Sequence, residues 1–360
     1  MDADRSANTH DDRSPDPADD RSPDPADDRS PDSDGDRLRD RSAGRPADRL
    51  RVLIVANMYP SAARPSYGVF VADQVAGLRA TGEVEVEVFH WDARRRPWRY
   101  ALATLELALT KVEADVVHAH YGLSGVVALA APRRLPLVLT VHGRDCHHPV
   151  VKRLTSLVAR RAAAVVAVSD ELAARCPFPV AAVIPPGVDL EQFRPLSRAE
   201  ARGRLGIDEW QGQRLIVFPA DPQRPEKRYA DARALIERLA ATRPDVELKA
   251  VFGRPRAEMP LWLNAADAVV VTSQREGYGL ACVEALACDV PVLSTPVGVA
   301  PTLLAGIDGC LCAPFDAARW SEHLNAVLAA DEPRVAGRAV AETQSLREAA
   351  RRTLQLYRNL

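Results

Sequence analysis

The stretch AVVVTSQREGYGLACVEALACDVPVLST (residues 268–295) decides the fold class, because it contains one complete strand–loop–helix–strand unit. A β-rich run, AVVVTS (268–273), precedes a glycine-flanked loop, a stretch of helical length and a short apolar run, PVLST (291–295). Uncharged strands that alternate with helices are typical of a parallel sheet covered on both faces. The unit therefore predicts an α/β architecture.

The same alternation extends over most of the chain. A polar, turn-rich break at 188–213 follows six β-rich runs. The six runs are 51–56, 84–89, 115–120, 136–143, 163–169 and 181–187. The pattern resumes after the break with the runs 214–220, 246–252, 268–273 and 291–295. We predict two Rossmann-like lobes in tandem, joined near Pro195, with ligands bound outside the carboxyl ends of the strands.

The first 49 residues differ in composition from the rest. Residues 11–34 repeat an eight-residue motif, DDRSPDPA, and contain no large apolar side chain. Such a segment cannot bury enough surface to offset the entropy of ordering it. We predict a disordered acidic repeat tail at 1–49, interpreted as a solvated extension, with a tether or an interaction arm as alternatives.

The remaining length fits two domains at roughly 150 residues each. We predict an N-terminal lobe at 50–195, a C-terminal lobe at 196–340 and a final helix at 341–360. In that helix Leu346, Ala350, Leu354 and Tyr357 have helical spacing.

Charge and composition limit the partners. Residues 1–49 hold fifteen Asp and nine Arg, a net charge of −6, so residues 50–360 carry +4 within a whole-chain charge of −2. A body charge of +4 is weak for nucleic-acid binding. No uncharged apolar run reaches the roughly 18 residues of a membrane span, and the polar N-terminus predicts no secretory signal. The six scattered cysteines favour free thiols, and we expect a cytoplasmic protein.

Two carboxylates and a glycine loop follow the strand at 268–273. Glu276 and Glu284 stand eight residues apart, and Gly277-Tyr278-Gly279 lies between them. Glycine lets backbone N–H groups approach a ligand, and the helix that follows presents its positive end to phosphate. Carboxylates can accept hydrogen bonds from the paired hydroxyls of a sugar and a ribose. The alternative for Glu284 is a solvent-facing position on an amphipathic helix.

Other candidates also follow strands. Gly68 precedes a helix and could admit an acceptor or a diphosphate, with an ordinary loop as the alternative. His142 ends a strand and could contact a reacting sugar, with a loop histidine as the alternative. Arg224 and Lys227 form a cationic pair before a helix, typical of a diphosphate clamp, with a solvated loop as the alternative.

Two further clusters contain residue types that could bind a metal or an anionic surface. Cys146-His147-His148 contains metal-ligand types, but adjacent residues point in different directions, so we predict no metal site. The run ARRRPWRY (93–100) interleaves Arg94, Arg95, Arg96 and Arg99 with aromatic residues. This pattern predicts weak peripheral contact with an anionic membrane surface, at the inner face of the membrane, with a solvated helix start as the alternative.

Six segments, in this order, resemble glycosyltransferase family 4. They are DVVHAHYGLSG (115–125), VLTVHGRD (138–145), VVAVSDEL (165–172), VIPPGVDLEQFRP (183–195), RPEKR (224–228) and the Glu-x7-Glu segment. The segments YPSAARPSYGVFVADQ (59–74), HAHYGLSG and FPADPQRPEKR are most similar to the branch of teichuronic acid biosynthesis glycosyltransferases.

The resemblance implies a GT-B fold with a ligand in the cleft between an acceptor-side first lobe and a donor-side second lobe, and a C-terminal helix at 341–360 that crosses back to the first lobe. It implies that Gly68 lies near the donor diphosphate and the acceptor, that His142 contacts the donor sugar, and that Arg224 and Lys227 bind the diphosphate. It further implies that Glu276 and the amides of Gly277, Tyr278 and Gly279 hold the sugar, and that Glu284 binds the ribose.

The resemblance also implies a function. We predict a retaining glycosyltransferase that uses a nucleotide-diphosphate sugar, needs no cofactor or metal, and acts on a glycan, lipid-linked or small-molecule acceptor in cell-surface polysaccharide or glycoconjugate synthesis. The alternatives are a non-catalytic nucleotide-sugar binder and a sugar-nucleotide epimerase on the same fold.

Three positions depart from the family pattern. Asp221-Pro222 replaces the usual Gly-Arg after the first strand of the second lobe, where Arg224 could substitute. Pro186 replaces the usual Asn before Gly187. The chain between Phe252 and Leu261 is shorter than in most members of the family, which predicts that the second lobe lacks one strand–helix pair.

Overall fold

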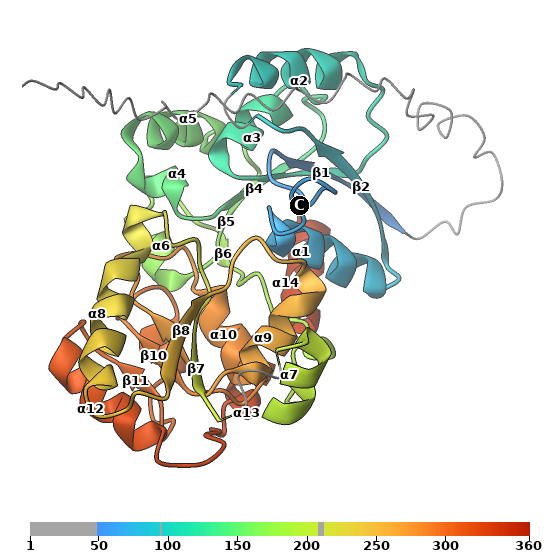
Figure 1. Ribbon diagram of the computed structural model, residues 1–360. Helices are drawn as coiled ribbons and strands as arrows, with labels where there is room; N and C mark the ends of the chain where they lie inside the picture. The colour runs from blue at the N-terminus through green and yellow to red at the C-terminus, as the bar shows by residue number, and fades with distance from the viewer. Residues whose placement is uncertain (1–48, 94–95, 208–211) are drawn as a thin grey trace, which may run out of the picture. The chain divides into compact units, whose positions relative to one another are not determined.

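The computed structural model describes residues 49–93, 96–207 and 212–360, which contain two parallel β-sheets (Figure 1). The predictions for the acidic tail, apart from Arg49, and for Arg94 and Arg95 lie outside these residues. No helix in the described ranges is long and apolar enough to cross a membrane.

The first sheet has the order β2-β1-β3-β4-β5-β6, and all neighbouring strands are parallel. Its strands are β1 Leu50–Ala56, β2 Val84–His90, β3 Val116–His120, β4 Leu137–Val141, β5 Ala164–Ala167 and β6 Ala182–Val183. The three central strands β3, β4 and β5 are buried along their whole length, as expected for a sheet covered on both faces. Each strand overlaps one of the six predicted runs, which confirms the predicted α/β class.

The second sheet has the order β11-β10-β9-β7-β8 and is also parallel within the described residues. Its strands are β7 Arg214–Phe218, β8 Val246–Ala250, β9 Ala268–Val271, β10 Val292–Ser294 and β11 Leu311–Cys312. The sequence did not predict β11, because a strand of two residues has no readable periodicity. The chain passes from the edge strand β8 to β9 through only a 3-10 turn and one short helix.

Helices flank both sheets. Around the first sheet they are α1 Val69–Ala80, α2 Trp98–Leu109, α3 Gly122–Ala128, α4 Arg144–His147, α5 Pro149–Ala159, α6 Asp170–Arg175 and α14 Leu346–Arg358. With the second sheet lie α7 Arg198–Leu205, η3 Pro225–Lys227, α8 Tyr229–Ala240, η4 Arg256–Glu258, α9 Met259–Ala265, α10 Leu280–Ala287, α11 Ala300–Leu303, α12 Ala317–Val327 and α13 Arg338–Glu342.

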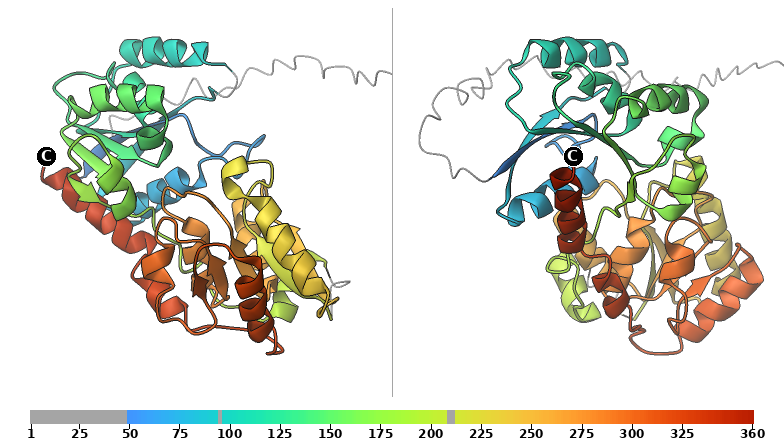
Figure 2. Two further views of the ribbon diagram at one scale, coloured as in Figure 1. Left: turned by 90° about the vertical axis from the view of Figure 1, so that its left-hand side faces the viewer. Right: turned by 180° about the vertical axis from the view of Figure 1, so that it is seen from behind.

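Alternate residues of β1 build two different cores. Val52 and Ile54 belong to an apolar cluster with residues of α1 and α14, whereas Leu53 and Val55 belong to a cluster with residues of α2, α3 and α5. The C-terminal helix α14 therefore packs beside α1 on the first sheet, as Figures 1 and 2 show. The apolar core on this face of the first sheet is thus completed by α14, the last helix of the chain that the structure describes.

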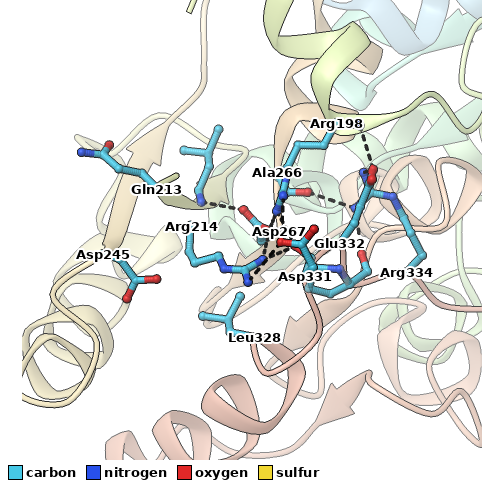
Figure 3. Close-up of polar contacts among 12 residues, drawn as sticks. Arg198, Gln213, Arg214, Asp245, Ala266, Asp267, Leu328, Asp331, Glu332 and Arg334 are labelled. Carbon is cyan, nitrogen blue, oxygen red and sulfur yellow. Dashed lines mark hydrogen bonds and ion pairs between the residues drawn. The ribbon is translucent and has the colours of Figure 1, made fainter. Parts of the chain in front are cut away.

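A buried carboxylate, that of Asp267, connects the second sheet to α7 at the N-terminal end of β9 (Figure 3). Asp267 is fully buried and pairs with three guanidinium groups, those of Arg198, Arg202 and Arg214. Its Oδ2 also accepts a hydrogen bond from the backbone N–H of Leu215 (2.9 Å). Because Asp267 immediately precedes β9, this network fixes β9 against β7 and α7.

Candidate active site

A cavity of about 380 Å³ lies where β7, β8 and β9 end. Its lining includes segments that follow these strands, the start of α10 and, from the other side, Ser66, Val69 and Phe70 at the start of α1. Ligands of parallel α/β sheets bind at this edge, so the cavity has the expected place for a donor site. Of the sequence candidates, Arg224, Lys227, Glu276, Gly279 and Glu284 line it.

Lys227 and Glu276 form an ion pair at the cavity. Lys227 Nζ donates to Glu276 Oε1 (2.6 Å), and both side chains are about 15% exposed. Ser273 Oγ donates to the same carboxylate oxygen (2.6 Å). The pair brings residues 227 and 276 together from two loops, one after β7 and one after β9, and it fixes both side chains before any ligand binds.

Arg224 is more exposed than Lys227 and pairs with Glu226. Its Nε donates to Glu226 Oε1 (3.0 Å), and its side chain remains 56% exposed. A guanidinium in this position can turn toward an anion in the cavity at little cost. At this cavity Lys227 is therefore a largely buried cation and Arg224 an exposed one.

The glycine loop 277–279 packs tightly against the first sheet's loops. A Cβ on Gly277 would lie 2.1 Å from the carbonyl oxygen of His142, so a side chain there is excluded. Ser169 Oγ donates to the carbonyl of Gly277 (2.7 Å). Gly279 has φ 96° and precedes α10 without a side-chain cap, so the first amides of α10 are open to an anion.

Tyr278 contributes only its backbone to the loop. Its ring is buried, and its hydroxyl donates to Gln344 Oε1 (2.8 Å). Burial raises the pKa of this phenol far above its usual value. The side chain therefore anchors the loop and does not face the cavity, while the amide of Tyr278 remains the group expected to contact a donor.

Glu284 is buried and paired with a residue that the sequence analysis did not single out. Arg256 Nη1 donates to Glu284 Oε1 (2.5 Å), and Arg256 Nη2 donates to Asp73 Oδ2 (2.8 Å). The guanidinium also stacks over Phe193, 4.5 Å from its ring centre. Arg256 thus links α10 to α1, and the solvent-facing alternative for Glu284 is wrong.

Burial raises the pKa of both carboxyl groups in this bridge, while Arg256 opposes the shift. A carboxylate in this environment costs stability unless a cation and hydrogen bonds compensate it. Arg256 occupies one oxygen of Glu284, and the other can accept hydrogen bonds from paired hydroxyls.

His142 lies at the end of a row of histidines. His120 Nδ1 and His142 Nε2 are 3.1 Å apart, and the rings of His118 and His120 stack at 4.4 Å. Burial lowers the pKa of His118 and His142 to about 3 and that of His120 well below its usual value. At neutral pH the imidazole of His142 is therefore uncharged. It contacts Phe70 (ring centres 4.7 Å apart), which lines the cavity.

Asp145 holds the loop that contains His142. Its Oδ2 accepts from the backbone N–H of His142 (2.7 Å), and its Oδ1 accepts from Gly122 at the start of α3 (2.5 Å). The carboxyl is fully buried, and this burial raises its pKa to about 6. Asp145 is a positioning residue that the sequence pattern did not reveal.

Gly68 has the backbone that its position requires. It caps α1 with φ 75°, and a Cβ there would lie 2.4 Å from the carbonyl carbon of Met58. The residues on either side of this turn, Ser66 and Val69, line the cavity. Gly68 therefore brings the start of α1 to the edge of the site.

The residues missed at the site have weak sequence signals. Ser273 ends a predicted strand, and His118 and His120 are alternate residues of another, so all three could have been inferred from the ends of the strands. Arg256 and Asp73 could not, because their pairing joins positions 183 residues apart.

The side chains of Cys146, His147 and His148 do not point toward one common site. Cys146 Sγ lies 2.7 Å from Cys176 Sγ, while His147 and His148 are exposed. Among the described residues, no group of three or more His, Cys, Asp or Glu side chains is arranged to hold a metal ion.

Two family models match the chain. The model of Glycosyltransferase Family 4 matches residues 45–192, and that of Glycosyl transferases group 1 matches residues 231–344. The two matches divide between the two sheets and leave the segment around α7 and β7 between them. They do not test the narrower resemblance to the teichuronic acid branch, which stays a prediction.

Relatives of this chain include inositol phosphate glycosyltransferases. A D-inositol 3-phosphate glycosyltransferase from Frankia alni is 33% identical over 267 residues, which are 59% of this chain and 65% of that protein. D-inositol 3-phosphate glycosyltransferase 1 from Catenulispora acidiphila is 30% identical over 61% of this chain and 64% of its own length. The chain thus spans slightly less than two thirds of these relatives.

Solved structures share the fold at low identity. Sucrose-phosphate synthase from Thermosynechococcus elongatus superposes with a TM-score of 0.67 at 19% identity, covering 86% of this chain and 98% of that one. HepE from Anabaena in complex with UDP-glucose gives a TM-score of 0.66 at 19% identity, covering 86% and 100%. The predicted GT-B arrangement of two parallel sheets is confirmed, and the chain is similar to Glycosyltransferase Family 4 over the first sheet and to Glycosyl transferases group 1 over most of the second.

Proposed function

We propose that this protein is a retaining glycosyltransferase that moves a sugar from a nucleotide-diphosphate sugar to a glycan, lipid-linked or small-molecule acceptor. One observation supports it above all: a single cavity brings together the Lys227–Glu276 pair, the buried Glu284 and the open amides at the start of α10. Synthesis of cell-surface polysaccharide or a glycoconjugate is the proposed context.

The roles follow from charge and placement. Lys227, Arg224 and the first amides of α10 form a cationic surface for the diphosphate. Glu276, held by Lys227 and Ser273, accepts hydrogen bonds from the donor sugar, and Glu284 accepts them from the ribose.

In the reaction, the bond between the sugar's anomeric carbon and the diphosphate oxygen breaks as a bond to the acceptor oxygen forms, and the acceptor hydroxyl gives its proton to the leaving diphosphate oxygen. Negative charge grows on the leaving diphosphate, where Lys227 and Arg224 stabilise it. His142, neutral at pH 7, is proposed to contact the sugar by a hydrogen bond rather than by charge.

We propose that the reaction needs no metal, so transfer should persist in EDTA.

Comparison with known proteins suggests which substrates to test first. HepE binds UDP-glucose in its solved complex, and the relatives from Frankia and Catenulispora are D-inositol 3-phosphate glycosyltransferases. UDP-hexoses are therefore the first donors to screen, and a phosphorylated cyclic polyol is the first acceptor.

A thermal-shift screen of nucleotide sugars, followed by product analysis, tests the proposal. A raised melting temperature with one donor and a glycosylated acceptor are the expected results. Donor stabilisation without turnover on any acceptor would identify a binder, and an altered sugar nucleotide without transfer would identify an epimerase; either contradicts the proposal.

The Arg256 bridge offers a matched pair of variants. Glu284→Gln removes the carboxylate expected to hold the ribose, so we expect donor affinity to fall by about tenfold or more. Asp73→Asn removes the other carboxylate bound to Arg256 and should leave donor affinity within about threefold, since Asp73 is not placed at the ribose. Titration calorimetry with the donor measures both. Equal losses would show that Glu284 acts through the bridge and not on the ribose.

The proposal includes a cytoplasmic protein with weak contact at the inner face of the membrane. Arg96, just before α2, is exposed, as such a contact needs, whereas Arg99 in the first turn of α2 is half-buried.

A further inference from the structure

Helix α2 presents large apolar side chains to solvent. Trp98, Leu102, Leu105 and Leu109 are 59%, 50%, 57% and 78% exposed. Their spacing of four, three and four residues places them on one stripe of the helix, at about 100° per residue. They are four of the nine exposed large apolar side chains found among the described residues, all from one helix of 12 residues.

The opposite face of α2 already supplies the core. Ala103 and Leu107 are buried in the cluster under the first sheet, where α2 packs against α3. The exposed stripe therefore serves no packing role in the described chain. A single exposed leucine needs no explanation, but a continuous stripe of four large apolar residues marks an interaction surface.

The segment of the chain that contains the stripe is basic. The segment 96–161, which includes α2, α3 and α5, holds ten Lys and Arg against four Asp and Glu, a net charge of +6. Since residues 50–360 carry +4 in total, the positive charge of the body is concentrated here. Glu106 is the one acidic residue on α2, on the flank of the stripe.

The layer around α2 repeats this composition. Helix α3 contacts both α2 and α5, and Figures 1 and 2 show the three over one side of the first sheet. On α5, Val150 and Leu157 are 59% and 56% exposed, and Arg153 on α5 and Arg160 just after it are exposed as well.

The chemistry of the surface selects its occupant. The chain's own acidic segment, residues 1–49, matches the charge but offers only Met1 and Leu38 as large apolar residues, so it cannot cover the stripe. A second copy would bring the same positive charge to the same face. An anionic lipid surface supplies both a negative potential and an apolar layer into which such a helix sinks by roughly 5–10 Å.

We propose that α2 is an amphipathic docking helix, which inserts Trp98, Leu102, Leu105 and Leu109 into an anionic membrane while exposed arginines of the same basic segment contact lipid headgroups. This moves the centre of the contact proposed above from the arginine cluster to the apolar stripe. The proposal does not depend on glycosyl transfer, because the assay below measures binding without turnover.

Sedimentation with vesicles of phosphatidylglycerol and phosphatidylcholine, compared with phosphatidylcholine alone, tests the docking helix on the full chain. We expect binding to the anionic vesicles, and we expect the variant Leu105→Glu/Leu109→Glu to lower partitioning by about tenfold or more. The matched control Ala318→Glu/Ala326→Glu makes the same charge change on exposed positions of α12 and should stay within about twofold of wild type. Thermal melts confirm that both variants fold.

Trp98 also reports insertion directly. Brominated lipids should quench wild-type fluorescence more than that of Trp98→Phe. Binding that fails at low salt, or that falls equally in both double variants, overturns the proposal. A wild-type dimer that Leu105→Glu/Leu109→Glu dissociates, without vesicle binding, would assign the stripe to a second copy and also overturn it.

Discussion

Replacing Lys227 with alanine is expected to lower kcat/KM for sugar transfer by about a hundredfold or more, the usual cost of removing a charge-stabilising donor from an active site. Lys227 is largely buried, and its ammonium lies 2.6 Å from Glu276. The substitution removes a cation proposed to bind the diphosphate and also one of two groups that hydrogen-bond Glu276. Steady-state kinetics with the donor found by screening measures the loss.

Two further variants make the result specific. Lys227→Arg keeps the charge and should recover part of the activity, whereas Arg224→Ala should cost less than Lys227→Ala because Arg224 is 56% exposed. Arg238→Ala removes an exposed cation from α8 and should leave transfer unchanged. If Lys227→Ala keeps full activity, the diphosphate site is assigned wrongly.

Replacing Asp267 with asparagine is expected to lower the free energy of unfolding by about 3–5 kcal/mol, the typical cost of breaking a buried ion pair from one side. Asp267 is fully buried, and Arg202 beside it is 4% exposed. Without the carboxylate, the guanidinium groups gathered around this position repel one another and lose their acceptor. Urea unfolding of the full chain measures the change.

Asp331 provides the matched control. It faces two of the same arginines, Arg198 and Arg214, but its side chain is 97% exposed. Solvent screens such a pair, so Asp331→Asn should cost less than about 1 kcal/mol. If the two substitutions cost the same, the network around Asp267 does not stabilise the second sheet in the way inferred here.

The fold was predictable because its strands have the most direct sequence signal. Runs such as 51–56 and 136–143 are short, predominantly apolar and separated by helical stretches, and each became a strand of a parallel sheet. The loop positions followed, since side chains after parallel strands gather at one edge. Lys227 and Glu276 were found in this way, although nothing in the sequence states that they form a pair.

Interactions between distant segments escaped prediction. The Arg256 bridge to Asp73 and Glu284 and the arginines around Asp267 join elements far apart in the chain, and no local pattern encodes which charges meet. The apolar stripe of α2 was hidden for another reason. The arginine-rich segment before α2 predicts a contact through charge. Exposure of the leucines depends on which face of the helix packs against the sheet, and the sequence does not state this.

The position of α14 sets an order for folding during synthesis. Ala350, Leu354 and Tyr357 complete the core beside Val52 and Ile54, and Tyr357 shares a hydrogen bond with His118 of β3. The last strand of that sheet ends at Val183, so 174 further residues must be made before Tyr357 exists. At about 5–20 residues per second, a nascent chain holds an unfinished first lobe for roughly 10–35 s. Its exposed apolar face is a natural client for a ribosome-associated chaperone, and the second lobe can finish folding before the first.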